Sequence, residues 1–475
     1  MEVLQRTANR GSISTGYDID NSLKFEPDNS ESMSRTPSSN GNLKTCTLSV
    51  WLKRTELKDG FYFSGDYGTV YPDSWFILGF VGDRIYFSTT AGISSAGEVR
   101  PNRVFRDTSA WYHIVVACDT TQSTAADRVK MYVNGVQETS FLVANYPNQN
   151  DDLDIMAAKA QGIGGYNDGV DYFYSGYMSE FVGIDGQQLD PTSFGEFDAD
   201  SGIWKPIDVS GLTFGTNGFY LDFEDASNLG NDASGGTDFA ETNITSADQA
   251  TDTPTNNFAI NNIIDGGANT SNSVSYKEGG TVQIRNQFTN YNYNFSTLGM
   301  PKGKWYAEFQ RGNDINLMIG IQLQNFDSTL SSRVNVYIGL GADNHGGALG
   351  TNGAYFYNNT VSTGYTAYGT SDILGIAVDC DNNKIYFSVN GTYVNSGNPA
   401  SGLNGFDFGP LETNEPCFFV INSYAPNLEH KANYGGYTTI SISTPATDEN
   451  GYGTFEYAPP SGYYALCTKN LAEYG

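Results

Sequence analysis

Two predicted loops combine flat aromatic side chains with polar side chains that hydrogen-bond hydroxyl groups. Their sequences are GDYGTVYPDSW (65–75) and GYNDGVDYFYSG (165–176). Sugar rings stack their C–H faces on aromatic rings, while amides and carboxylates hydrogen-bond the sugar hydroxyls. The loops are therefore candidate glycan-binding sites, although the same rings could pack under their own loops or against a neighbouring subunit. The candidate residues are Tyr67, Tyr71, Trp75, Tyr166 and Tyr172.

The segment TNYNYNF (289–295) is a third stretch of the same composition. The two loops also carry aspartates, and Ca²⁺ prefers carboxylate and carbonyl oxygens. Asp66, Asp73 and Asp168 are the candidate calcium ligands. We expect no cofactor other than such a calcium ion.

One carboxylate pair has a spacing that could serve glycoside hydrolysis. Asp222 and Glu224 alternate in FYLDFED (219–225) and would share one face of a strand. A retaining glycosidase holds its two carboxyl groups ~5–5.5 Å apart. However, one such pair among 53 acidic residues is expected by chance, and a solvated strand face or a strand-end turn explains it as well.

The remaining residue types give no catalytic pattern. The chain contains no GxSxG, HExxH or GxxxxGK[ST] element. Its histidines are too few and too scattered for a metal site or a triad; they are His113, His345 and His430. We therefore expect a protein that is not an enzyme, with His113 hydrogen-bonded and partly buried in an apolar strand.

The elements that must position these residues are short β-strands. Charged residues make up only 16% of the chain and aromatic residues 14%, with 54 glycines to form turns. In TCTLSVWLKR (45–54), Cys46, Leu48, Val50 and Leu52 alternate with polar residues and share one face. Similar runs recur every 8–12 residues with Gly, Asn and Asp between them, which is typical of a β-sandwich.

Two hairpins echo each other in the two halves of the chain. HIVVACD…DRVKMYVNG (113–135) and LGIAVDCDNNKIYFSVNG (374–391) both run strand, acidic turn, strand and Asn-Gly. The Asn-Gly pairs predict type I′ turns, which require a positive φ at both central residues. We therefore expect two all-β sandwiches of similar topology.

The domain organisation follows from shifts in composition. Residues 1–22 are polar and without periodicity, which predicts an arm, and residues 23–225 form the first sandwich. Residues 226–262 are rich in Asn, Asp, Thr, Ser and Gly and predict a polar linker. Residues 263–475 form the second sandwich.

Charge and cysteine content limit the partners. The formal net charge of −28 argues against nucleic acid, because phosphate binding needs clustered Lys and Arg. No run approaches the ~20 apolar residues of a membrane helix, and the first residues lack the apolar stretch of a signal peptide. The five cysteines contain no CxxC pair, so we expect buried thiols rather than a disulfide framework. Synthesis in a reducing cytoplasm fits these features.

The first half resembles the laminin G-like and concanavalin A-like jelly-roll family. The resemblance rests on LSVWLKR (48–54), DRIYFSTT (83–90) and SAWYHIVVACDTTQSTAADRVKMYVNGVQ (109–137). It implies two antiparallel sheets with ligand sites in the rim loops.

The second half resembles a SPRY-type domain of the same sandwich class. GKWYAEFQ (303–310) is similar to the opening strand of that domain, and DILGIAVDCDNNKIYFSVNGTYVNSG (372–397) is similar to its most recognisable segment. EPCFFVIN (415–422) fits the strand that follows.

The combination resembles appendage proteins of marine bacteriophages. The stretches that carry this resemblance are 16–25, 34–54, 238–259 and 459–471. It implies a virion surface protein, in a tail fibre, tail-associated or head fibre, that contacts host glycans or receptors. Residues 1–22 would then dock on other virion proteins, and the chain would form a homo-oligomer such as a trimer. Two alternatives stay open: a structural decoration or connector protein, and a glycan depolymerase.

Overall fold

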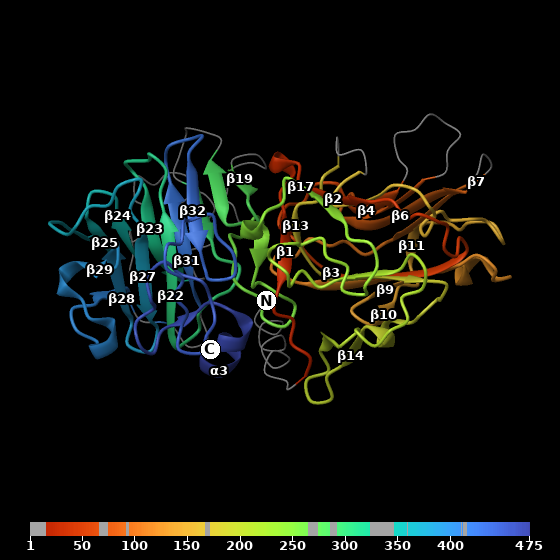
Figure 1. Cartoon of the computed structure of the whole chain (residues 1–475). Coiled ribbons are helices and arrows are strands. Elements are labelled where there is room, and N and C mark those ends of the chain that lie inside the picture. Colours follow the sequence, from red (N-terminus) through yellow and green to blue (C-terminus); the bar gives the residue numbers. More distant parts are fainter. Residues whose placement is uncertain are drawn as a thin grey trace. The chain divides into compact units, whose positions relative to one another are not determined.

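A computed structural model describes residues 16–65, 75–91, 95–166, 172–264, 274–285, 292–323, 346–358, 360–409, 411 and 416–475. The chain divides into two compact units, residues 1–255 and 256–475. Each unit consists of sheets whose strands pair almost entirely in antiparallel fashion (Figure 1). Within the described ranges the one α-helix is α3 (Thr468–Tyr474). The prediction of an all-β chain with two sandwiches is confirmed.

In the first unit, one sheet has the strand order β10-β9-β8-β3-β13-β1-β18, with β16 beside β13. The facing sheet has the order β11-β7-β6-β5-β4-β12-β2-β17. The strands of the first sheet are β1 (Ser22–Phe25), β3 (Thr45–Arg54), β8 (Tyr112–Asp119), β9 (Val129–Val133), β10 (Val136–Gln137), β13 (Gly176–Asp185), β16 (Phe219–Leu221) and β18 (Gln249–Ala250). Those of the facing sheet are β2 (Ser32–Arg35), β4 (Gly60–Gly65), β5 (Phe76–Val81), β6 (Arg84–Ala91), β7 (Ser95–Pro101), β11 (Phe141–Asn145), β12 (Gln161–Ile163) and β17 (Ala240–Thr242).

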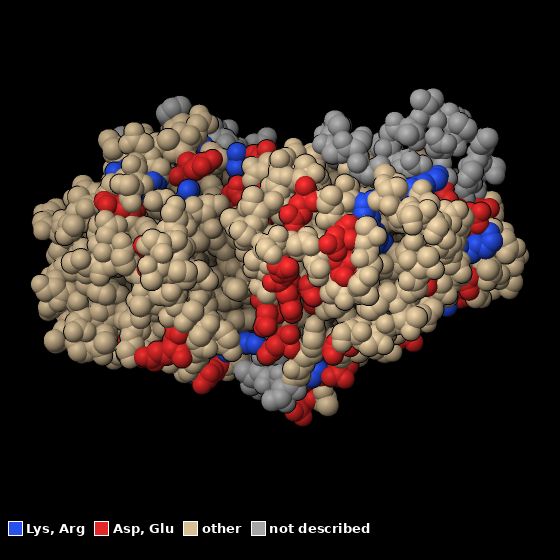
Figure 2. Space-filling model, in the orientation of Figure 1, with Lys and Arg blue, Asp and Glu red and all other residues tan. Residues whose placement is uncertain are grey.

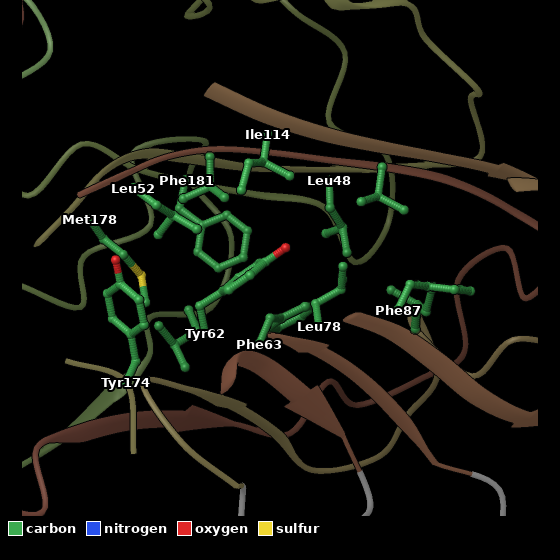
Figure 3. Packing of buried hydrophobic residues seen from close by; sticks show 14 of the residues in the cluster. Leu48, Leu52, Tyr62, Phe63, Leu78, Phe87, Ile114, Tyr174, Met178 and Phe181 are labelled. Atoms are coloured by element: carbon green, nitrogen blue, oxygen red, sulfur yellow. The ribbon is translucent and has the colours of Figure 1, made fainter. Parts of the chain in front are cut away.

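The core of this unit lies between the two sheets. The predicted inner face of β3, formed by Cys46, Leu48, Val50 and Leu52, is buried there. Figure 3 shows Leu48 and Leu52 from β3 meeting aromatic and aliphatic side chains of the facing strands β4, β5 and β6. Burying a side chain of this size contributes about 1.5–3 kcal/mol before conformational entropy is subtracted.

The second unit is also a two-sheet sandwich. Its sheets have the orders β19-β20-β32-β22-β27-β28-β29 and β21-β31-β23-β24-β25-β26. The first contains β19 (Val274–Lys277), β20 (Val282–Arg285), β22 (Lys304–Gln310), β27 (Leu374–Asp379), β28 (Lys384–Val389), β29 (Thr392–Tyr393) and β32 (Glu429–Asn433), with β30 (Phe406–Asp407) beside β28 and β33 (Tyr464–Ala465) beside β22. The second contains β21 (Asn292–Phe295), β23 (Met318–Leu323), β24 (Gly346–Gly350), β25 (Tyr355–Tyr357), β26 (Thr360–Ser362) and β31 (Cys417–Ser423).

The two echoing hairpins adopt the same local structure. Asn134 and Gly135 have φ values of 47° and 78°, and Asn390 and Gly391 have φ values of 49° and 77°, as type I′ turns require. The Asn134 side chain accepts a hydrogen bond from the backbone N–H of His113 at 2.8 Å. In the second unit, the Asn390 side chain accepts from the N–H of Ile373 at 2.9 Å. Each asparagine thus ties its turn to the start of the first strand of its hairpin, β8 in the first unit and β27 in the second.

In place of the expected linker, residues 226–255 are built into the first unit. Their strands β17 and β18 pair with β2 and β1. Leu229, Phe239 and Ile244 belong to the core. The composition suggested a linker because large apolar residues are few in this segment. In the structure, however, the apolar residues that are present are buried, and the carboxylates pair with side chains inside the sandwich.

Two buried ion pairs hold this segment in place. The Lys24 ammonium lies 2.8 Å from Asp248, and the Lys53 ammonium lies 2.6 Å from Asp252. Both lysine side chains are fully buried. Asp252 also accepts a hydrogen bond from the Trp111 indole at 3.0 Å. A buried charge left without its partner is strongly unfavourable, so these aspartates fix the segment on the sheet.

The described end of the expected N-terminal arm is part of the same sandwich. Ile19 is buried, and its backbone N–H donates to the Thr255 hydroxyl at 3.0 Å. Strand β1 begins at Ser22. Residues 1–15 lie outside the described ranges.

The sequence GYYALCT (462–468) predicts one more strand for the second unit. In the structure, Tyr464–Ala465 pairs in parallel with β22, and Cys467 forms an isolated bridge with Phe258. The chain then turns into α3, whose Leu471 is buried in the core. Five to seven apolar residues cannot by themselves distinguish a strand from a short buried helix.

Candidate functional site

The outer face of the β4–β5–β6 layer carries a group of five aromatic residues and one isoleucine, which we call the aromatic face: Phe61, Trp75, Ile77, Tyr86, Tyr166 and Tyr172. A β-bulge in β4 shifts the register between Phe61 and Phe63. Phe63 is therefore buried in the core while Phe61 belongs to a separate outer cluster. Gly79 in β5 makes room for it, because a Cβ at this position would lie 2.3 Å from the Phe61 ring.

The rings of the aromatic face contact one another closely. The Phe61 ring stacks on Tyr172 with centroids 4.9 Å apart and 9° between the planes. It meets Tyr166 edge to face at 4.8 Å, and Tyr166 meets Tyr172 at 5.3 Å. Trp75 and Tyr86 are partly buried against the same cluster. Such contacts hold the rings in fixed orientations.

Tyr172 is the most exposed ring of the group. It is 48% exposed, and one of its ring faces lies against Phe61. Its backbone φ of 54° is left-handed, which is unusual for a large side chain. A hydrogen bond of 2.8 Å from the Phe61 N–H to the Tyr172 carbonyl holds the backbone there. The fold thus presents this ring at the surface on a rigid support.

Polar groups border the aromatic face on the β7 side. The Arg100 guanidinium lies 4.8 Å from the centre of the Tyr86 ring and 2.7 Å from a Glu98 carboxylate oxygen. Val99, between them, points into the core. Arginine and carboxylate beside flat rings are the groups that hydrogen-bond sugar hydroxyls while the rings stack on the sugar.

The structure brings Trp75, Tyr166 and Tyr172 together from the two predicted loops. Tyr166 is only 8% exposed, so its main role is to support Tyr172. The sequence did not reveal Phe61 and Tyr86, because the bulge that turns Phe61 outward has no signal in FYF. The other predicted site residues lie outside the described ranges: Tyr67, Tyr71, Asp66, Asp73 and Asp168.

The described part of the third aromatic stretch, residues 292–295, belongs to a packed cluster. Tyr293 and Phe295 are buried with Phe418 and Val420 of β31. Their rings therefore serve packing in the second unit.

Among the described residues, no group of three or more His, Cys, Asp or Glu side chains is arranged to hold a metal ion. On the face shown in Figure 2, acidic side chains are more prominent than basic ones, many of them gather in a band near the middle of the view, and much of the rest of this face is uncharged. No helix in the described part of the chain is long and apolar enough to cross a bilayer.

Asp222 and Glu224 do not share a strand face. Strand β16 ends at Leu221, and Phe223 has a left-handed φ of 59°. The Glu224 N–H donates to the Asp222 carboxylate at 3.1 Å, so the two residues form a strand-end turn. This corrects the expected strand placement.

A buried carboxyl group that the sequence did not single out lies beside this turn. Glu180 sits in a bulge of β13 with a φ of 49° and accepts a hydrogen bond from the Tyr220 hydroxyl at 2.8 Å. Tyr17 approaches both, at 3.1 Å from Tyr220 and 3.5 Å from Glu180. Burial, and then the nearby carboxylates of Asp222 and Glu224, raise the pKa of Glu180 to about 8. Glu180 is therefore mostly protonated at pH 7.

His113 is fully buried, more deeply than the sequence suggested. Its Nδ1 accepts from the Trp204 indole at 2.9 Å, and its Nε2 lies 2.8 Å from the Ser49 hydroxyl. Trp204 is part of a small ribbon of β14 (Gly195–Phe197) and β15 (Trp204–Pro206). Burial lowers the pKa of His113 to about 3. With both nitrogens occupied inside the protein, this histidine is structural.

Residues 28–183 match the family model described as the concanavalin A-like lectin/glucanases superfamily. The matched range contains most of the first sandwich and all of the aromatic face. The first unit therefore contains a laminin G-like, concanavalin A-like jelly roll. The family unites lectins with glucanases, so the match leaves binding and hydrolysis both open.

Solved structures similar to this chain include the SPRY domain of human HERC1, with 12% identity, a TM-score of 0.26 and coverage of 36% of this chain and 96% of that domain. The TRIM65 PSpry domain has 10% identity and a TM-score of 0.28, with coverage of 37% and 88%. A SAP-like pentraxin from Limulus polyphemus has 16% identity and a TM-score of 0.27, with coverage of 37% and 80%. No curated protein matches this sequence.

Proposed function

We propose that this protein binds carbohydrate through the aromatic face of its first sandwich. The observation that carries the proposal is Tyr172, a ring 48% exposed and stacked on Phe61 at 4.9 Å. A flat, supported ring has the chemistry that sugar recognition requires, and the Arg100–Glu98 pair beside Tyr86 adds polar groups to the same aromatic face. The lectin-containing family that matches residues 28–183 supports the same role.

The proposal extends to the setting of the protein. The chain acts as a bacteriophage appendage protein, in a tail fibre, tail-associated or head fibre, and its sugar ligand is a host-surface glycan or receptor. This part rests on the resemblance of the sequence to marine phage appendage proteins and on its β-sandwich architecture. Binding rather than catalysis is favoured because Asp222 and Glu224 form a turn and do not face each other across an open strand surface.

Arrays of bacterial surface polysaccharides test the binding proposal with the full chain. We expect binding that weakens about tenfold, or ~1.4 kcal/mol, when Tyr172→Asn removes the ring. Asparagine tolerates the left-handed backbone at this position, so folding is preserved. Tyr172→Phe keeps the ring and should keep most of the affinity.

The matched control is Phe197→Ala. Phe197 is 52% exposed, close to the value for Tyr172, but it lies on β14 away from the aromatic face. Its loss should leave binding unchanged. Absence of binding to every polysaccharide would favour a structural decoration or connector protein instead, and release of shortened sugar chains would favour a depolymerase.

A further inference from the structure

Four of the five cysteines lie in two close pairs, one in each sandwich. Cys46 of β3 is directly opposite Cys118 of β8 in the sheet register. Cys380, which follows β27, has its Sγ 3.7 Å from the Sγ of Cys417 in β31. Cys467 is not part of either pair, and all five cysteines are free thiols buried in the fold.

The pair in the first unit has the backbone geometry of a disulfide. Directly opposed residues of antiparallel strands have Cα atoms about 4.5–5.5 Å apart, and disulfides span roughly 4.4–6.8 Å. Both side chains point into the same core. A hydrogen bond with the Cys118 thiol is the main cause that raises the pKa of Cys46, so the two sulfur atoms are neighbours.

The pair in the second unit connects its two sheets. Both thiols point at the Met300 carbonyl, from 3.8 Å for Cys380 and 3.6 Å for Cys417. Backbone hydrogen bonds fix the three segments: the Cys380 N–H donates to Gly303, and Met300 exchanges bonds with Cys417 in both directions. The thiols are therefore held side by side by the backbone rather than by chance rotamers.

We propose that the two pairs are oxidation sites that form the disulfides Cys46–Cys118 and Cys380–Cys417 under oxidising conditions. The oxidant is a low-molecular-weight disulfide. One protein thiolate attacks a sulfur of the oxidant and releases one small thiolate, and the partner thiolate then displaces the second. The protein pair loses two electrons and two protons, and the oxidant leaves as two small thiols.

Burial sets when the reaction occurs. Each paired side chain is at most 4% exposed, and burial raises the pKa of the Cys380 thiol, so little thiolate is available in the folded state. The oxidant therefore reaches the pairs while the sandwiches fold or transiently open. A chain that folds in a reducing cytosol keeps its thiols, and a chain that folds in an oxidising solution is cross-linked within each sandwich.

The two disulfides would close loops of different length in the two units. Cys46 and Cys118 lie in strands separated by β4 to β7, and Cys380 and Cys417 are joined by a shorter stretch. Closing a longer loop restricts the unfolded chain more strongly. Oxidation should therefore raise the denaturant midpoint of both units, and that of the first unit by more.

Refolding of the full chain tests the proposal. The chain is unfolded and reduced, then refolded either with a mixture of oxidised and reduced glutathione or with dithiothreitol. After oxidative refolding we expect the thiols titrated in denaturant to fall from five to one in the unmodified chain, and from four to two in Cys118→Ala. Mass spectrometry of unreduced peptides should show Cys46 linked to Cys118 and Cys380 linked to Cys417.

Cys467 provides the internal control, because it is as deeply buried as the paired residues. Cys467→Ala should give no titrated thiol after oxidative refolding and the same two linked peptides. Five thiols after oxidative refolding, or a link that involves Cys467, would overturn the proposal. If refolding gives aggregate, the folded chain can instead be incubated with oxidised glutathione at a urea concentration just below its unfolding transition. We expect the same numbers of titrated thiols in this experiment. Five retained thiols would again contradict the proposal.

Discussion

Replacing Glu180 with glutamine removes a buried carboxyl group whose ionisation the fold opposes. The folded protein raises the pKa of Glu180 from 4.5 to about 8 because burial and the carboxylates of Asp222 and Glu224 disfavour the charge. Below pH 4.5 the group is neutral in both states and its stabilising contribution is complete. That contribution is lost as the pH rises toward 8, because only the unfolded chain ionises freely.

The size of the effect follows from the two pKa values. A tenfold difference in proton affinity corresponds to ~1.4 kcal/mol. The full shift of the Glu180 pKa from 4.5 to about 8 therefore changes the unfolding free energy by at most about 5 kcal/mol. Between pH 6.5 and 8 the unfolding free energy of the first unit should fall by about 2 kcal/mol relative to Glu180→Gln. The buried, neutral His113, with a pKa of about 3, makes the unfolding free energy rise with pH, which is the opposite trend. That rise takes place mainly below pH 6.5, so it hardly affects this window.

Urea denaturation at pH 5, 6.5 and 8 measures this difference. Tryptophan fluorescence reports mainly on the first unit, which contains four of the five tryptophans: Trp51, Trp75, Trp111 and Trp204. Glu196→Gln is the control, because this side chain is 57% exposed on β14, and it should follow the unmodified chain at every pH. Parallel pH profiles for Glu180→Gln and the unmodified chain would refute the reasoning.

Three further substitutions probe the fold, each by urea denaturation. Asp252→Ala leaves the fully buried Lys53 without its partner and should destabilise the first unit by about 3–5 kcal/mol; a loss below ~1 kcal/mol would contradict the pairing. Asn390→Ala should cost the second unit about 2 kcal/mol, because alanine is strained at a φ of 49° and one backbone N–H loses its acceptor. Gly79→Ala brings a Cβ to within 2.3 Å of the Phe61 ring and should destabilise the first unit by about 1–3 kcal/mol, whereas an unchanged midpoint would show that Phe61 is not held there.

Alternation and turn chemistry made the strands predictable. The inner face of β3 and the two Asn-Gly turns follow from local sequence, because side chains alternate across a sheet and type I′ turns need residues that tolerate positive φ. These features are set by neighbours in the chain.

Long-range partners made the remaining features unpredictable. Residues 226–255 look like a linker until Asp248 and Asp252 are seen paired with buried lysines in distant strands. The bulge at Glu180 is likewise defined only by the partner strand β3. Composition shows that a residue is polar, but it does not show which oppositely charged side chain the residue pairs with in the folded chain.

The candidate site was predictable in part for the same reason. Aromatic, Asn- and Asp-rich loops pointed to Trp75, Tyr166 and Tyr172, which the structure brings together. Phe61 supports Tyr172 only because a bulge and a glycine on the next strand turn its ring outward.

The central claim is that Tyr172 is a ring on which a sugar stacks. The most direct measurement is calorimetric titration of the full chain with a polysaccharide that it binds on the array, comparing the unmodified chain, Tyr172→Phe and Tyr172→Asn. We predict similar affinity for the first two and an affinity about tenfold lower for Tyr172→Asn. Equal affinity for all three chains would contradict the claim.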